Sequence, residues 1–208
     1  MFRRDELDAL EDELDGVFDL HERSKDPVHR AMEEGVIREQ TKTEDSYERK
    51  LSDLLGPDVP APEEPHVCEQ CRGGFPEGVS IKELLNQDRD PLYVRAYRWA
   101  TKVFAWARGN YWHNGMRNRD MFRVHLNAYL VPVKVAFGLA EESNEDEHAP
   151  RIAGFEYDLA LAYLARTRES LGALRTMGLE DPDLLWMIDE ADALGLQIAE
   201  RRARFPLL

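Results

Sequence analysis

From about Asp90 onward, the sequence places apolar side chains three and four positions apart over four long segments. This spacing puts the apolar side chains of each segment on one side of an α-helix. The four segments cover about 91–109, 117–140, 150–177 and 182–203, and short polar stretches join them. The pattern predicts an all-α fold whose C-terminal part is an antiparallel (up-down) four-helix bundle.

Three Asp-Pro pairs mark predicted helix starts, because an aspartate side chain caps free backbone N–H groups and proline suits the first helical position. The pairs are Asp26-Pro27, Asp90-Pro91 and Asp181-Pro182. Pro132 lies inside the segment 117–140, so we expect a kink or a break there, since proline lacks the backbone donor. Residues 109–116 are bounded by glycines and are predicted to form a loop.

The predicted bundle occupies residues 89–208, and two further parts precede it. Residues 1–56 are predicted to be an acidic arm of N-terminal helices. Residues 57–88 are rich in proline and glycine, which is typical of an extended linker. The chain is therefore expected to contain one helical domain with an N-terminal extension.

The acidic arm is predicted to hold helices over about 4–24, 28–37 and 45–55. The first of these has a single narrow apolar seam, which suits docking on another helix. The seam consists of Leu7, Leu10, Leu14 and Val17.

Charge is unevenly distributed along the 208 residues, whose net charge is −14. Residues 1–64 carry twenty acids and nine bases, whereas residues 86–140 carry nine bases and three acids. An acidic chain lacks the positive footprint that general nucleic-acid binding needs, so nucleic acid is not an expected partner. We expect the acidic arm or a neighbouring acidic helix to neutralise the basic region within the fold.

Targeting signals are not apparent in the sequence. The N-terminus lacks the apolar segment of a secretion signal, and no run approaches the roughly 18 apolar residues of a membrane span. The two cysteines are spaced CxxC and do not form a disulfide framework. These features predict a cytoplasmic protein that does not enter a membrane.

The segment from His66 to Gly74 contains the pattern HxCxxC, formed by His66, Cys68 and Cys71. Two thiolates at this spacing can bind one zinc ion, but a structural site needs a fourth ligand, which the segment does not supply. Redox chemistry would require the CxxC between a strand and a helix, and here it follows a proline-rich stretch. The sequence therefore leaves two main alternatives, no cofactor or one zinc ion.

A carboxylate-bridged metal centre inside the bundle is not expected. Such centres take glutamates from facing helices. Residues 91–140 contain only one acid, Asp120, so two of the four predicted helices cannot supply bridging carboxylates.

Arg119 and His125 are separated by five residues at the start of a predicted bundle helix. This pair resembles the Arg-x(4–6)-His motif of HEPN-domain ribonucleases, which are also helical bundles. The resemblance covers these two positions and the fold class. It implies metal-independent RNA cleavage, with the histidine as acid and base and the arginine on phosphate. The alternative is that His125 is a core residue, because it shares an apolar side with Met121, Phe122 and Tyr129.

Basic and aromatic residues of the two middle helices form a candidate surface for a ligand or an anion. The aromatics at helical spacing are also typical of a core, whereas Trp112 and His113 fall in the predicted loop. The candidates are Arg95, Arg98, Lys102, Trp112, His113 and Arg123.

The sequence favours a non-enzymatic interaction or regulatory protein. Its acidic N-terminal helices are predicted to bind a protein partner or another copy of the chain. Metal binding at HxCxxC and ribonuclease activity at Arg119 and His125 are the alternatives.

Overall fold

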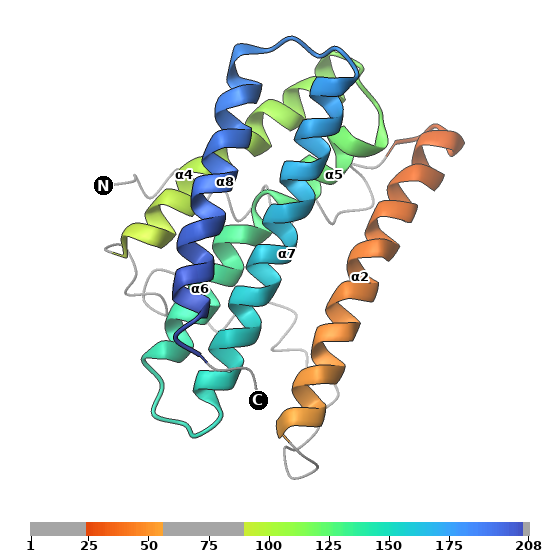
Figure 1. Ribbon diagram of the computed structural model, residues 1–208. Coiled ribbons are helices and arrows are strands. Elements are labelled where there is room, and N and C mark those ends of the chain that lie inside the picture. Colours follow the sequence, from red (N-terminus) through yellow and green to blue (C-terminus); the bar gives the residue numbers. More distant parts are fainter. Residues whose placement is uncertain (1–23, 56–89, 206–208) are drawn as a thin grey trace, which may run out of the picture.

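The computed structural model describes residues 24–55 and 90–205, and these ranges are mainly helical with no β-strand. The predicted seam of Leu7, Leu10, Leu14 and Val17 and the HxCxxC segment lie outside the described residues. The helices are α2 (Pro27–Leu55), α4 (Pro91–Arg108), the π-helical turn η3 (Gly109–His113), α5 (Arg119–Asn127), α6 (Leu130–Glu142), α7 (Ala149–Thr176) and α8 (Pro182–Arg202) (Figure 1).

All three predicted Asp-Pro helix starts are confirmed. The carboxylate of Asp26 accepts hydrogen bonds from the backbone N–H groups of Val28 and His29, at 2.9 and 3.0 Å. Asp90 caps α4 and Asp181 caps α8 in the same manner. Each cap supplies an acceptor to N–H groups that have no partner within the helix.

The predicted division of α2 into helices over 28–37 and 45–55 is wrong, because the structure has one continuous helix of 29 residues. Thr41 and Thr43 occupy its middle, where each hydroxyl donates a hydrogen bond to the carbonyl four residues earlier, on Ile37 and Glu39. These bonds satisfy the two hydroxyls within the helix itself, which continues through both residues.

The predicted loop over 109–116 is shorter than expected, because its first half continues α4 as the π-helical turn η3. The backbone N–H of Asn114 reaches back five residues to the carbonyl of Gly109, at 3.1 Å. Such a turn holds one more residue than an α-helical turn, and Tyr111 within it is completely buried. The chain then turns at Gly115, whose φ of 72° lies in the left-handed region that favours glycine.

The predicted helix over 117–140 is broken into α5 and α6 by a turn at Ala128 and Tyr129. Pro132 lies in the first turn of α6 and cannot donate to the carbonyl of Ala128, four residues earlier. The break predicted from this proline is therefore confirmed, and it falls on the N-terminal side of the proline.

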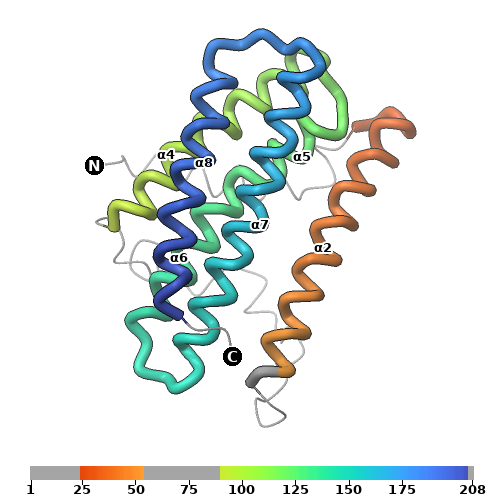
Figure 2. The backbone as a smooth tube through the Cα atoms, viewed as in Figure 1, coloured from red at the N-terminus to blue at the C-terminus, as the bar shows by residue number. Residues whose placement is uncertain are grey.

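Helices α4 to α8, with η3, form one helical body around a shared apolar core. The long helix α7 packs against α5, α6 and α8, while α4 packs against α5, α6 and α8. Figure 2 shows the chain reversing direction between α7 and α8. No described helix combines the length and the apolar character that crossing a bilayer requires.

Helix α2 lies alongside the helical body, where it packs on α5 and α7 (Figure 1). Thus a segment of the acidic arm lies on its own body, on a face to which the basic helix α5 contributes.

Candidate functional site

The most deeply buried of the described side chains of α2 are mostly polar, and Met32, Ile37 and Tyr47 pack beside them partly buried. Residues 33, 36, 40, 44 and 47 follow helical spacing on the side that faces the body. The side chains of Glu33, Val36 and Gln40 are at most 5% exposed, and only Val36 among these three is apolar. Helices that pack permanently on a core normally use an apolar stripe, so this docking surface is unusual.

Glu33 is completely buried and accepts two hydrogen bonds from different parts of the chain. The hydroxyl of Tyr111 donates to Oε1 at 2.5 Å, and the backbone N–H of Ser24 donates to Oε2 at 3.1 Å. Arg117 in turn donates to Oγ of Ser24 at 3.2 Å. The first part of α2 is thereby tied to η3 and to the loop before α5.

Glu44 repeats this arrangement about three helical turns further along α2. Its Oε1 accepts a hydrogen bond of 2.6 Å from the hydroxyl of Tyr163 on α7. Burial, followed by the bond to the carboxylate, raises the pKa of both Tyr111 and Tyr163. Both phenols therefore stay protonated at neutral pH and act as donors to the carboxylates of α2.

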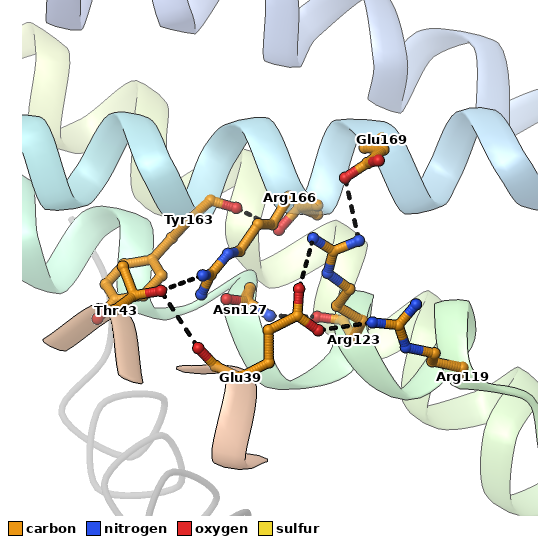
Figure 3. Close-up of polar contacts among 9 residues, drawn as sticks. Glu39, Thr43, Arg119, Arg123, Asn127, Tyr163, Arg166 and Glu169 are labelled. Carbon is orange, nitrogen blue, oxygen red and sulfur yellow. Dashed lines mark hydrogen bonds and ion pairs between the residues drawn. The ribbon is translucent and has the colours of Figure 1, made fainter. Parts of the chain in front are cut away.

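Glu39 lies between these two contacts and pairs with two arginines of α5 (Figure 3). Its Oε2 lies 2.7 Å from Nη2 of Arg119, and its Oε1 lies 3.4 Å from Nη2 of Arg123. The side chain of Arg123 is only 10% exposed and also contacts Glu169 of α7 at 3.0 Å. The single carboxylate of Glu39 thus lies within ion-pair distance of two positively charged guanidinium groups.

One turn after Glu39, the hydroxyl of Thr43 accepts a hydrogen bond from Arg166 of α7 (Figure 3). Beyond it, the ring of Tyr47 meets that of Phe155 edge-on, with centroids 6.3 Å apart. The site therefore presents three arginines and two tyrosine hydroxyls toward α2: Arg119, Arg123, Arg166, Tyr111 and Tyr163.

Two buried side chains in this region have polar atoms without a hydrogen-bond partner among the described residues. Gln40 is 5% exposed, and its Oε1 is unpaired. Asn127 is 1% exposed; its Nδ2 donates to the carbonyl of Arg123 at 2.8 Å, but its Oδ1 is unpaired. The fit between α2 and the body is therefore incomplete in hydrogen bonding.

Chemically, this face of α5 and α7 is suited to holding carboxylates of a helix. Tyrosine hydroxyls and guanidinium groups donate hydrogen bonds, and the arginines add opposite charge. The prediction that acidic helices neutralise the basic region is confirmed at Arg119 and Arg123, which pair with α2 and α7, and at Arg95.

The residues of the predicted anion surface are divided among three places. Arg95 forms a bidentate pair with Glu190 of α8, with contacts of 2.6 and 2.9 Å. Lys102 lies over the ring of Trp186, 4.4 Å from its centroid, and Arg98 is exposed. Arg123 instead faces α2 and α7.

The two loop candidates fall at η3. Trp112 is half-buried, and its ring lies below the guanidinium of Arg117, at 5.3 Å. His113 is exposed at the end of η3.

The proposed ribonuclease pair is not assembled in this conformation. Arg119 is engaged by Glu39, as described above. His125 is 3% exposed, its ring stacks on Phe104 at 4.5 Å, and burial lowers its pKa to about 4. Acid–base chemistry on RNA at neutral pH would need an accessible imidazole with a pKa near 7. The ribonuclease hypothesis stays a prediction without support from this geometry.

The predicted metal ligands His66, Cys68 and Cys71 lie outside the described residues. Within residues 24–55 and 90–205, no group of three or more histidine, cysteine, aspartate or glutamate side chains is arranged to hold a metal ion.

The carboxylates of α2 and their tyrosine and arginine partners were not predicted from the sequence. A search for apolar periodicity overlooks a docking side composed of glutamate, glutamine and threonine. The signal that the sequence does contain is the recurrence of polar residues at helical spacing, namely Glu33, Gln40 and Glu44 around Val36.

No model of a known protein family matches the chain, and no curated protein and no solved structure was found to be similar to it.

Proposed function

We propose that the chain is a non-enzymatic protein-interaction module, in which the face of α5 and α7 binds an acidic α-helix. Helix α2 is the occupant that the chain itself provides. The observation that supports this proposal is the polar attachment of α2, through Glu33, Glu39 and Glu44.

A polar interface supports an interaction role because both of its surfaces tolerate water when they separate. Interfaces that form and dissociate are more polar than permanent ones. Between α2 and the body, carboxylates contact hydroxyls and guanidinium groups, and among the side chains of α2 whose burial is described, Val36 is the only apolar one that is fully buried. Met32, Ile37 and Tyr47 of α2 are partly buried and also pack against the core, so releasing α2 would expose these side chains and Val36 together with the polar contacts.

The attachment of α2 to the same chain determines how strongly a partner must bind. Thirty-four residues separate Leu55 from Asp90, so α2 is a tethered competitor with an effective concentration on the order of millimolar. A partner helix in solution must therefore bind tightly enough to displace the tethered α2. The proposed module is consequently closed until a suitable partner helix is present.

A charge reversal at Glu39 tests the proposal. Glu39→Arg in the full chain places a third guanidinium against Arg119 and Arg123, so we expect α2 to leave the body. Hydrogen exchange of the α2 amides should then accelerate at least tenfold. The matched control is Glu34→Arg, which makes the same charge change on an exposed position of the same helix and should leave exchange unchanged.

The second measurement is binding of a fluorescent peptide spanning residues 24–55. We expect it to bind the Glu39→Arg chain at least tenfold more tightly than the wild-type chain, because the tethered competitor is gone. Adding Arg119→Glu to Glu39→Arg should restore protection of α2 through the reversed ion pair. Unchanged exchange in Glu39→Arg, or a peptide that binds both chains equally, would rule out the proposed interaction site.

We further propose that the helical body is an up-and-down four-helix bundle made of α4, α5 with α6, α7 and α8. The short connections support this topology: residues 143–148 join α6 to α7 and residues 177–181 join α7 to α8. In this arrangement α5 and α6 together form the second helix, interrupted at Ala128 and Tyr129.

A zinc-binding role for His66, Cys68 and Cys71 is the second candidate function, supported by the CxxC spacing. Two cysteines spaced CxxC do not make a disulfide framework, and this supports the proposal of a cytoplasmic location. The zinc content of the untagged, purified chain is the measurement that tests this candidate.

A further inference from the structure

Gln40, on the polar side of α2, is not satisfied by the docking of the helix. Gln40 lies on the line between Glu33 and Glu44, within the interface with α5 and α7. It is 5% exposed, yet its Oε1 has no hydrogen-bond partner among the described residues. A buried acceptor without a partner loses its hydration and gains no replacement.

The helical body also has a buried acceptor without a partner in the described ranges, on the surface that faces α2. Asn127 continues the stripe of Arg119 and Arg123 on α5, and Figure 3 places it among Glu39, Arg123 and Arg166. Its Oδ1 is also unpaired. The carboxylate contacts of α2 are therefore well formed, whereas the amide oxygens of Gln40 and Asn127 between them have no partner among the described residues.

From this contrast we infer that α2 is a weak, displaceable occupant, and that the site binds a partner protein's acidic amphipathic helix more tightly. This inference rests on the proposed function. The partner helix carries carboxylates at the spacing of Glu33, Glu39 and Glu44, which is Glu-x5-Glu-x4-Glu. In the position of Gln40 it carries leucine or methionine.

An apolar side chain at this position is favourable for two reasons. It removes the unpaired amide from the interface, and it adds an apolar contact next to that of Val36. The gain expected from replacing one unpaired buried polar group is on the order of tenfold in affinity.

A second copy of the chain is a poorer occupant than such a partner. Its α2 would carry the same Gln40 and make the same contacts, so it would have no advantage over the tethered helix. The tethered helix would occupy the site in preference to the second copy, because its effective concentration is on the order of millimolar. The observations therefore favour a different protein over self-association.

Three synthetic peptides spanning residues 24–55 test the inference against the full-length Glu39→Arg chain. They are the wild-type peptide, one with Gln40→Leu and one with Thr41→Leu, whose position is exposed. We expect the Gln40→Leu peptide to bind about tenfold more tightly than the wild-type peptide. The Thr41→Leu peptide, which gains the same side chain on the outer side, should bind like wild type.

A variant of the intact chain provides an independent readout. Gln40→Leu in the full-length wild-type chain should slow hydrogen exchange of the α2 amides about tenfold, because the tethered helix then docks more tightly. It should also abolish residual binding of the wild-type peptide.

The outcomes separate this inference from the proposed function. If the wild-type peptide binds but Gln40→Leu gives no gain, or Thr41→Leu gives an equal gain, the inference is overturned and the interaction site stands. If no peptide binds the Glu39→Arg chain, both fail. A wild-type dimer that dissociates on Glu39→Arg substitution would overturn the choice of a different protein as partner.

Discussion

At the scale of single residues, His125 shows how burial changes the chemistry of a side chain. Its ring is 3% exposed and lies on Phe104. Burial, with a smaller contribution from the charge of Arg108, lowers its pKa from 6.5 to about 4. The imidazole is therefore neutral in the folded protein at pH 7 and serves as a packing residue.

This lowered pKa predicts a loss of stability in mild acid. Below pH 6.5 the unfolded chain takes up a proton at His125 that the folded chain refuses until about pH 4, so the free energy of unfolding falls across that window. At pH 5 the loss from this group is about 2 kcal/mol. The free energy of unfolding, measured with urea, should be lower at pH 5 than at pH 7.5 in the wild-type chain. His125→Phe should reduce this difference by the contribution of His125.

The exposed His113 provides the control for this experiment. His113→Gln should retain the wild-type difference between the two pH values, because an exposed side chain changes its surroundings little on folding. An equal loss of stability in wild type and His125→Phe would contradict the assignment to His125.

Gly138 on α6 allows the ring of Tyr157 to lie directly on the helix. A Cβ at this position would be 2.7 Å from Cζ of Tyr157, a fully buried ring whose hydroxyl is bound to Glu142 at 2.5 Å. Because the ring cannot move easily, Gly138→Ala should lower the free energy of unfolding by about 1–3 kcal/mol.

Gly172 on α7 is the matched control, since a Cβ added there would meet no neighbouring atom within 4 Å. Gly172→Ala should raise the free energy of unfolding by about 0.5–1 kcal/mol, because alanine restricts the unfolded chain and favours the helix. Chemical denaturation of both variants measures the contrast, and effects of the same sign would argue against the close packing of Gly138 and Tyr157.

At the scale of helices, local sequence signals predicted where helices begin better than they predicted which other helices each one contacts. Asp26, Asp90 and Asp181 each cap a helix as predicted, because capping depends on residues close in sequence. Two of these caps also contact other helices: Asp181 accepts from the indole N–H of Trp106 at 2.7 Å, and Asp90 pairs with Arg201 at 3.0 Å. Those second roles could not be predicted from local sequence.

Helix α2 is the element whose role depends most on its surroundings. Two of its three most deeply buried described side chains, Glu33 and Gln40, are polar, so apolar periodicity alone does not mark its docking side. Tyr111, Arg119 and Tyr163 supply donors to its carboxylates from three separate parts of the chain. The docking side of α2 is thus defined by its partners in space.

At the scale of the whole molecule, one arginine joins three helix ends. Arg201 in the last turn of α8 binds Glu142 at the end of α6 through two contacts of 2.7 Å, and it binds Asp90 at the start of α4 at 3.0 Å. These residues are far apart in the sequence, and their side chains are about one-fifth exposed, at 18–21%. The cluster stabilises the relative position of the three helices.

Removing this arginine should destabilise the fold substantially. Arg201→Met leaves two largely buried carboxylates without their counter-charge, so we expect a loss of about 2–4 kcal/mol in the free energy of unfolding. The comparison is Arg168→Met, which removes an equally bidentate pair with Asp192 whose side chains are both 52% exposed. That change should cost less than about 1 kcal/mol, because water screens the pair. Thermal or urea unfolding of both variants gives the answer, and similar losses would contradict the dependence on burial.

The sequence by itself determined the helical character of the chain, the helix starts and the break associated with Pro132, because apolar spacing, capping and proline act over a few residues. Only the tertiary structure decided that α2 is one helix docked on α5 and α7, that His125 is buried, and that Arg119 and Arg123 face Glu39. A glutamate side chain on a helix can be solvated by water, or it can be buried and accept hydrogen bonds from other side chains. The choice depends on tyrosines and arginines that only folding brings within hydrogen-bonding distance.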